Sequence, residues 1–381
     1  MSVPLESGPA SGVAGASSSG VIGCSVFDLD TPALVVDLAV MERNIQRMAS
    51  SFRSAGVRWR PHTKAIKVPA LAHKLLQAGA SGITCAKLGE AEVMAAAGIG
   101  DIMIANQVVG ETKIARLMQV LAQADVVVAA DNADAVAALD RAAARAGRRP
   151  RVVVEVDIGM HRAGVAPGAP TVDLARRIDR CRALRFAGLM GWEGHTVHLA
   201  DPAEKTRAVT ESVRLLTDSA RQCREAGLAV DIVSCGGTGT YQLTANLPGV
   251  TEIQAGGGIF CDVYYHDVMH VDHEYALTVL ATVTSRPVPT RIICDAGKKS
   301  MSSDAAMPRP LIETPLTRMA LSAEHTIVEL AEPDARLKVG DRIQFIVGYS
   351  DTTTMLHDEL YGVRDGRVEA VWPILGRGKL R

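Results

Sequence analysis

The sequence has few aromatic residues and no excess of charge of either sign. Phe, Trp and Tyr make up 4% of its 381 residues, and 41 Lys and Arg face 42 Asp and Glu. Nucleic-acid surfaces need clustered cations and usually aromatic side chains for stacking. Charged residues also interrupt the longest apolar runs well before the ~20 residues that a membrane helix needs. We therefore expect no nucleic-acid partner and no membrane partner.

The chain also lacks paired cysteines and a secretion signal. Its seven cysteines are odd in number and include no CxxC pair, so neither a disulfide framework nor a zinc site of that type is indicated. Free thiols are typical of a reducing compartment. The first 22 residues are rich in Ser, Gly and Ala and have neither a basic start nor a long apolar centre. We expect a cytoplasmic protein with a disordered tail over residues 1–24.

Hydrophobic residues make up 48% of the chain, and two kinds of segment alternate regularly along it. Short β-branched runs alternate with Ala-, Leu-, Glu- and Arg-rich stretches whose apolar residues recur at helical spacing. Eight such steps predict a (β/α)8 TIM barrel over residues 25–270. An open doubly wound sheet is the alternative, but it carries its Gly-rich loop after the first strand, whereas the glycines here come last. The predicted strands begin at Val57, Gly82, Asp101, Asp125, Arg151, Leu184, Val230 and Thr251.

The pattern changes after about residue 270. Segments such as YALTVLATVTS, TRIICDAG and DRIQFIVGYS are short, β-rich and separated by Pro, Gly and Asp. They predict an antiparallel β domain over residues 271–381. Residues 25–40, around FDLDTPALVVDL, are candidates for an additional part of this domain.

The first predicted barrel strand carries Arg60, His62 and Lys64. Alternation along a strand points these side chains the same way, and barrel active sites are built at the C-terminal ends of the strands. If this face is inward, Lys64 lies in the barrel mouth, where a lysine is costly unless it is neutralised or paired. A Schiff base with a cofactor aldehyde is one way to neutralise it. The other interpretation places Lys64 on the rim, in water.

Two Gly-rich segments, 234–240 and 255–258, follow the last two predicted strands. Barrels commonly bind phosphate after strands seven and eight, through backbone N–H groups and short hydroxyl side chains. Each segment alone is equally typical of a tight turn. Together with a lysine at strand one, they outline a site for pyridoxal 5′-phosphate (PLP). The candidate cofactor-binding residues in these segments are Gly237, Thr238, Gly239, Thr240, Gly256 and Gly257.

Further candidates follow strands five and six. Arg162 is a candidate to hydrogen-bond the cofactor, with His62 beside it, and Trp192 is a candidate to stack on the cofactor ring. His195 and His198 are candidates for a general base, because histidine as a residue type commonly serves in that role. A purely structural role is the alternative for each of these residues.

Sequence motifs cover nearly everything after residue 25: DLDTPALVVD, RPHTK, DIGMHRAGV, GGTGTY, QAGGGIF, DAGKKSMSSD, AEHT and LHDELYGVRDGRVEAVWPILGRGKLR. In these motifs the chain resembles the fold-type III pyridoxal-phosphate enzymes, specifically the family of D-threonine aldolase and D-serine dehydratase-like proteins. The resemblance implies an alanine racemase-like barrel and a D-serine dehydratase-like C-terminal β domain. It also implies an internal aldimine on Lys64 and a homodimer with active sites near the interface.

Two positions depart from the family pattern. Metal-dependent members present His-x-Cys or His-x-Asp late in the chain, where the pair binds a divalent cation (Mn, Mg or Zn) beside the substrate hydroxyl. Here Asp351 matches the second ligand, but Tyr349 stands in the place of the His. A phenol must first lose a proton with a pKa near ~10, which makes it a poor ligand for such a cation. The other departure is Ile66, which replaces the His of the usual Lys-x-His-Lys.

Three hypotheses follow. The first is a PLP-dependent lyase that acts on β-hydroxy D-amino acids, by retro-aldol cleavage to glycine and an aldehyde or by dehydration. It works through an external aldimine released from Lys64, with His195 or His198 as the base. The second is a PLP-dependent amino-acid racemase or epimerase that uses Lys64 and Tyr349 as its two bases. The third is a non-catalytic PLP carrier, which the extra C-terminal domain disfavours. The substrate side chain is not determined by the family.

Overall fold

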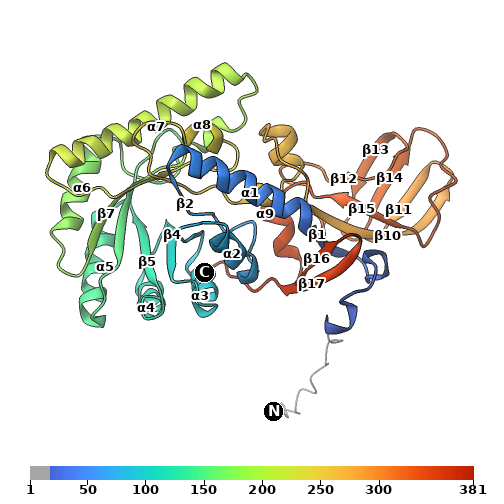
Figure 1. Ribbon diagram of the computed structural model, residues 1–381, viewed down its shortest axis with the longest axis horizontal. Helices are drawn as coiled ribbons and strands as arrows, with labels where there is room; N and C mark the ends of the chain where they lie inside the picture. Colours follow the sequence, from blue (N-terminus) through green and yellow to red (C-terminus); the bar gives the residue numbers. More distant parts are fainter. Residues whose placement is uncertain (1–17) are drawn as a thin grey trace, which may run out of the picture.

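The computed structural model describes residues 18–381, and these fold into two parts that lie side by side (Figure 1). One part is an eight-stranded parallel sheet that curls into a barrel, with helices around it. The other part is built on a nine-stranded sheet. The predicted TIM-like barrel followed by a strand-rich domain is therefore confirmed.

The barrel strands follow the order β2-β9-β8-β7-β6-β5-β4-β3. The two end strands are linked where Thr84 donates to the Pro61 carbonyl at 2.9 Å and Thr63 donates to the Thr84 carbonyl at 2.7 Å. Each strand begins within two residues of its predicted start. The strands are β2 (Arg58–Trp59), β3 (Ile83–Cys85), β4 (Asp101–Gln107), β5 (Asp125–Ala130), β6 (Arg151–Glu155), β7 (Arg185–Met190), β8 (Ile232–Cys235) and β9 (Glu252–Ile253).

The helices cover the outside of the barrel because their apolar stripes pack on strands that are buried on both faces. Side chains fix several helix starts: the carboxylate of Asp37 and the amide of Asn132 each accept a backbone N–H of the first helical turn. Gly56 and Gly147 end the same two helices in the left-handed conformation, at φ 68° and 62°. The helices are α1 (Leu38–Ala55), α2 (Pro69–Gln77), α3 (Leu88–Ala96), α4 (Glu111–Val120), α5 (Ala133–Ala146), α6 (Ala169–Asp179), α7 (Pro202–Glu225) and α8 (Tyr241–Thr244).

A buried ion-pair cluster closes the N-terminal end of the barrel. The Arg60 side chain is 2% exposed and donates to Glu252 at 2.9 Å and to Asp101 at 2.8 Å. Glu252 and Asp101 are the first residues of β9 and β4. Because charge at this end is fully paired, the floor of the barrel is a structural feature, and any open chemistry must lie at the opposite end.

In the second sheet, β1 lies between β10 and β16, so a strand from the N-terminal part of the chain completes this domain. The expected antiparallel pairing has one exception, because β1 runs parallel to β16. No hairpin joins β1 to β16, so the connection between them does not force the two strands to run antiparallel. The strands are β1 (Ala33–Asp37), β10 (Leu277–Val288), β11 (Arg291–Cys294), β12 (Arg309–Pro310), β13 (Leu316–Leu321), β14 (Thr326–Leu330), β15 (Arg342–Ile346), β16 (Glu359–Arg364) and β17 (Arg367–Pro373), with the short helix α9 (Ser350–Thr353).

The disordered tail expected over residues 1–24 needs a correction. Residues 1–17 lie outside the described part of the chain. From there a 3₁₀ turn at Ser18–Val21 leads to Gly23, which donates to the Val368 carbonyl of β17 at 2.8 Å. Val21 and Cys24 pack against a small apolar cluster of the second sheet, and this burial holds the segment in place.

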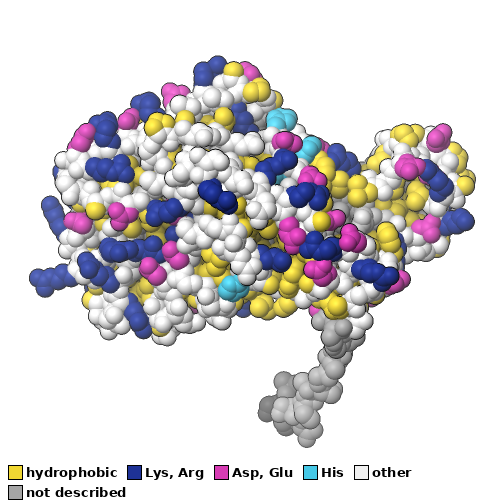
Figure 2. All heavy atoms as spheres, in the orientation of Figure 1, with side chains coloured by type: hydrophobic (Ala, Val, Ile, Leu, Met, Phe, Trp, Pro, Cys, Tyr) yellow, Lys and Arg dark blue, Asp and Glu magenta, His cyan; other side chains and the backbone are white. Residues whose placement is uncertain are grey.

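The C-terminal end returns to the barrel and lies beside α2 and α3 (Figure 1). On the face in Figure 2, basic and acidic side chains are interspersed and do not gather by sign. All seven cysteines are free. Among the described residues, no helix has both the length and the apolar character to cross a bilayer.

Candidate active site

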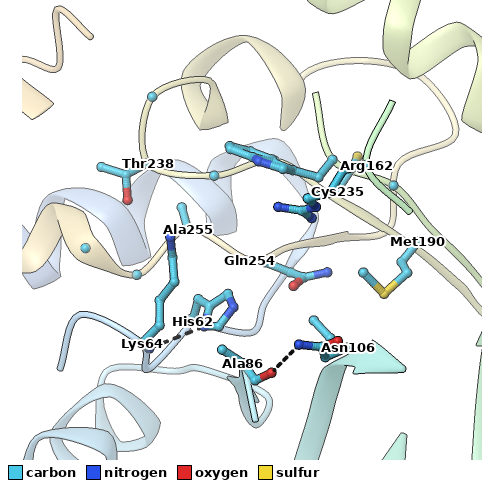
Figure 3. Close-up of a pocket in the computed structure, with 18 of the residues that line it drawn as sticks. His62, Lys64, Ala86, Asn106, Arg162, Met190, Cys235, Thr238, Gln254 and Ala255 are labelled. Atoms are coloured by element: carbon cyan, nitrogen blue, oxygen red, sulfur yellow. Dashed lines mark hydrogen bonds between the residues drawn. The ribbon is translucent and has the colours of Figure 1, made fainter. Parts of the chain in front are cut away.

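A cavity of about 390 Å³ opens at the C-terminal ends of the barrel strands. Its lining comes from the segments that follow β2, β3, β4, β6, β7, β8 and β9, as expected for a barrel active site. In Figure 3, Lys64 and His62 enter from one side, while Thr238 and Ala255 face them from the other. The structure therefore brings the predicted lysine and the two predicted Gly-rich segments into one cavity.

Lys64 extends into this cavity and is paired with a buried carboxylate. Its Nζ lies 2.7 Å from Oδ2 of Asp351; the side chains are 43% and 10% exposed. The attraction of Asp351 raises the pKa of Lys64 above its ordinary value. Burial works to raise the pKa of Asp351, but the opposing attraction of Lys64 keeps it below its ordinary value. The lysine is thus a charged group facing the cavity and not a rim residue in water.

His62 lies beside Lys64 as a neutral ring. Its Nδ1 accepts the backbone N–H of Lys64 at 3.3 Å. Burial, helped by the positive charge of Lys64, lowers the pKa of His62 to about 3. A ring that stays neutral near pH 7 can pack on an aromatic cofactor without adding charge.

The two Gly-rich segments leave backbone groups free at the cavity wall. Among the described residues, the N–H groups of Gly239 and Gly256 donate to no protein atom, while Gly258 N–H donates to the Thr238 hydroxyl at 3.1 Å and ties the segments together. A Cβ on Gly237 would lie 2.2 Å from the Trp192 ring, and one on Gly256 would lie 2.2 Å from a backbone oxygen. Free N–H groups and glycines that allow close approach fit a phosphate group.

Thr240 is placed differently from its prediction as a cofactor-binding residue. It is buried outside the cavity lining, and its hydroxyl donates to the Glu193 carboxylate at 2.7 Å. The same carboxylate accepts the Thr244 hydroxyl at 2.8 Å and the Gly236 N–H at 3.3 Å. Glu193, which sequence reasoning passed over, therefore positions the segment that Thr240 was expected to present to the cofactor.

Arg162 and Trp192 both line the cavity, as predicted. The Arg162 side chain is 56% exposed and lies 3.9 Å from the Glu155 carboxylate, so its guanidinium is free to bind an anionic or phenolic oxygen. Trp192 backs the Gly237 segment. The roles of these residues toward a cofactor stay predictions.

His195 and His198 do not line the cavity, which corrects their placement as candidate bases. After β7 the chain enters a 3₁₀ turn at Gly194–Thr196, and this turn directs both rings elsewhere. His195 Nε2 lies 3.3 Å from the Ser212 hydroxyl on α7, and His198 Nε2 lies 3.0 Å from the Tyr264 hydroxyl. Neither ring is placed to act beside Lys64.

Tyr349 lines the cavity next to Lys64. Its ring packs edge-on against Tyr265 with centroids 5.7 Å apart. Burial raises the pKa of Tyr349, so the phenol keeps its proton near neutrality. Tyr265 donates to Asp351, at 3.3 Å.

The residues around Asp351 do not fit a divalent cation. In the described part of the chain, no group of three or more His, Cys, Asp and Glu is arranged to hold a metal. The neighbours of Asp351 are the Lys64 ammonium and the Tyr265 and Tyr349 phenols, and a protonated ammonium or phenol is a poor ligand for a divalent cation.

Sequence reasoning missed several residues at the site. Asp262 accepts the backbone N–H of Tyr265 at 2.8 Å and of Ser350 at 2.7 Å, and so fixes both segments that face Asp351. Burial raises the pKa of Asp262 to about 7. The motif QAGGGIF is followed within two residues by this aspartate, but only the fold shows what it holds. Other cavity residues that had not been singled out include Asn106, Gln107, Met190, Gln254 and Tyr265.

Comparison with known proteins gives consistent matches. Residues 36–263 match the family described as alanine racemase, N-terminal domain, and residues 276–363 match a serine dehydratase domain. A D-threonine aldolase of an Arthrobacter species is 38% identical over 354 residues, which are 92% of this chain and 93% of the relative. A D-threo-3-hydroxyaspartate dehydratase of a Delftia species is 35% identical over 291 residues, 75% of this chain and 76% of the relative. The crystal structure of D-threonine aldolase from Filomicrobium marinum gives a TM-score of 0.91 at 36% identity and covers 94% of this chain and 99% of that one.

Proposed function

Because this chain belongs to the alanine racemase N-terminal domain family of PLP enzymes and is joined to a serine dehydratase domain, we propose that it is a PLP-dependent lyase of β-hydroxy D-amino acids. The observation that carries the proposal is the position of Lys64, which enters the barrel mouth opposite two Gly-rich segments. The likeness to D-threonine aldolases over more than nine-tenths of the chain supports the substrate class.

The proposed cofactor-binding residues surround the cavity. Lys64 would hold the aldehyde carbon of PLP, and Thr238, Gly239 and Gly256 would hold its phosphate. Arg162 and Trp192 would contact its ring. When bound, PLP supplies an electron-accepting ring that makes the bonds at the substrate Cα labile.

Side chains around Lys64 set its charge and the place of its proton. Asp351 pairs with the Lys64 ammonium at 2.7 Å, and this pair would hold Nζ and its proton in the barrel mouth, where the cofactor would bind. The neutral His62 ring adds no charge beside it. Tyr265 donates to the Asp351 carboxylate at 3.3 Å, so this carboxylate is shielded while Lys64 stays open to the cavity.

We propose retro-aldol cleavage to glycine and an aldehyde as the main reaction. The match to D-threonine aldolase extends over 92% of the chain, against 75% for the dehydratase relative. Dehydration is the second candidate, because the two relatives are similarly identical to this chain in the residues that align.

Racemisation fits the site less well. It requires a proton acceptor on each face of Cα, but burial raises the pKa of Tyr349, so this phenol keeps its proton near neutrality and is a poor acceptor. A carrier role is disfavoured by the second domain, whose matched relatives are lyases.

We also propose a homodimer and a cytoplasmic location. The dimer rests on the family resemblance, and light scattering after gel filtration would measure it. The location is supported by the seven free thiols.

Proton NMR of the PLP-loaded protein tests the proposed reaction. D-Threonine, D-serine and D-3-hydroxyaspartate are added separately in D₂O, first with a chelator and then with Mn²⁺; L-threonine is the stereochemical control. We expect glycine and acetaldehyde from D-threonine and no product from L-threonine. A keto acid would assign the dehydratase. Exchange of the α-proton with an intact carbon skeleton and mixed chirality would overturn the lyase in favour of a racemase.

A further inference from the structure

The Asp351 carboxylate is surrounded by hydrogen-bond donors. Lys64 Nζ lies 2.7 Å away and the Tyr265 hydroxyl donates to it at 3.3 Å, and the Tyr349 ring packs edge-on against that of Tyr265. A cation at this position would have to displace the lysine or approach it closely. The carboxylate is therefore committed to the protein's own N–H and O–H groups.

Tyr349 is fixed by the fold and needs no bound ion to place it. The next residue, Ser350, donates its N–H to the buried Asp262 at 2.7 Å. The preceding residue, Gly348, accepts the Tyr264 N–H at 3.0 Å. The Tyr349 ring then packs edge-on against Tyr264 with centroids 5.0 Å apart.

Of the groups in this cluster, Tyr349 and Tyr265 bring hydroxyls to the cavity wall, whereas Asp351 lies behind them and is not part of the lining. A protonated phenol can donate one hydrogen bond and accept others. It is therefore suited to hold a neutral alcohol, which also donates and accepts. Tyr349 is the one of the two that occupies the sequence position of the histidine in the metal-dependent pattern.

We infer that this chain binds the β-hydroxyl of its substrate without a divalent cation, through the Tyr349 phenol, which packing against Tyr264 and Tyr265 holds at the cavity wall. The inference rests on the proposed function for the identity of the substrate. The absence of a cation site rests on the residues alone. The hydrogen bond orients the hydroxyl at Cβ, the task that a cation performs where the His-x-Asp pattern is complete.

Binding of Mn²⁺, followed by electron paramagnetic resonance of the free ion, tests the cation part without any turnover. We expect the PLP-loaded wild-type protein to bind no more Mn²⁺ than an Asp351→Asn variant. Wild-type binding of one ion per chain that Asp351→Asn abolishes would overturn the inference. A Tyr349→His variant completes a His-x-Asp pair and is the positive control for Mn²⁺ binding.

Steady-state kinetics with a chelator present test the role of the phenol. We expect Tyr349→Phe to lower kcat/KM for D-threonine cleavage by about 10²-fold, and to slow α-proton exchange of D-alanine, which has no β-hydroxyl, by a much smaller factor. Tyr264→Phe is the matched control, because its hydroxyl contacts His198 and does not line the cavity. An equal loss with both amino acids would assign Tyr349 a general structural role and overturn the inference.

The two proposals fail in different ways. If the wild-type protein cleaves none of the β-hydroxy substrates, the proposed function fails, while the Mn²⁺ measurement still decides whether a cation site exists. If cleavage occurs but stops in the chelator and returns with Mn²⁺, the proposed function stands and the further inference is wrong.

Discussion

The floor and the mouth of the barrel carry two cations from the same short segment, yet the fold uses them differently. Arg60 is 2% exposed and is enclosed by Glu252 and Asp101. Lys64, two alternations further on, is paired with one carboxylate and is 43% exposed toward a cavity. A fully paired guanidinium stabilises the barrel, whereas a half-paired ammonium next to open space is available for chemistry. Position along a barrel strand thus separates structure from function.

Replacement of Lys64, the cation in the barrel mouth, should have the largest effect, a loss of turnover. We expect Lys64→Ala to lower kcat for D-threonine cleavage by about 10³-fold or more, since the group that holds the cofactor is lost. The free energy of unfolding should change little, because Asp351 keeps the Tyr265 hydroxyl as a hydrogen-bond donor. Turnover assays and urea denaturation of the same preparations measure both quantities. Near-normal turnover of Lys64→Ala would contradict the contrast between a functional Lys64 and a structural Arg60.

Replacement of Arg60, the cation at the barrel floor, should lower stability and leave turnover nearly unchanged. Arg60→Met leaves the buried Glu252 with only the Ser234 hydroxyl at 2.9 Å and Arg58 at 3.8 Å, so we expect the free energy of unfolding to fall by about 3 kcal/mol. Turnover per folded molecule should stay close to normal. The double variant Arg60→Met, Glu252→Gln is the control and should recover part of the loss. Normal stability combined with lost turnover would place Arg60 in the site.

A smaller effect is expected where the Gly-rich segments meet the tyrosines. A Cβ on Gly257 would lie 2.4 Å from the Tyr265 hydroxyl, whereas Gly100 has no atom within 4 Å of such a Cβ. Gly257→Ala should therefore weaken PLP binding about tenfold, roughly 1.4 kcal/mol, and Gly100→Ala should not. Titration of apo-protein with PLP, followed by absorbance, measures both dissociation constants. Equal constants for the two variants would show that the close approach at Gly257 is not needed.

The residue between the two cations, His62, should give an effect that appears only as the pH is lowered, a pH dependence of stability. An unfolded histidine takes up a proton near pH 6.5, whereas burial holds the pKa of folded His62 at about 3. Between these values the unfolded state binds more protons, so stability contributed by His62 falls as the pH falls, by up to about 1.4 kcal/mol per pH unit. Asp262, with its pKa raised to about 7, gives a slope of opposite sign between about pH 4 and 7.

Because the two slopes oppose each other, the difference between variants is the useful quantity. Denaturant titrations of wild type and His62→Asn at several pH values between 4 and 6.5 should show a slope that is less positive in the variant. Identical slopes would mean that His62 is protonated in the folded state and that Lys64 does not lie beside a neutral ring.

The barrel could be predicted from the sequence because its determinants are local and repeated. Each strand start is marked by a β-branched run, and each helix by apolar spacing and Gly ends, so strands were placed to within two residues. The sequence could only suggest that β1 belongs to the second sheet, because its pairing with β10 and β16 joins segments more than 200 residues apart. Nothing in a local pattern specifies such a partner.

The site was predictable where one strand or one loop decides it. Lys64 and the Gly-rich segments follow from strand alternation and from the position of loops in a barrel. His195, His198 and Thr240 were misplaced because a 3₁₀ turn and the buried Glu193 carboxylate redirect them. The contacts of Lys64 with Asp351 and of Tyr265 with Tyr349 join segments far apart in the sequence, and such contacts depend on packing that spacing does not reveal.

The most direct test of the account is to locate the cofactor. PLP-loaded protein is treated with borohydride, which fixes the cofactor to the lysine that holds it, and the labelled peptide is identified by mass spectrometry. The account predicts a label on Lys64 and none on the nearby Lys67, which is buried in a pair with Glu90. A label on Lys67, on another lysine or on none would contradict the assignment of the barrel mouth as the active site.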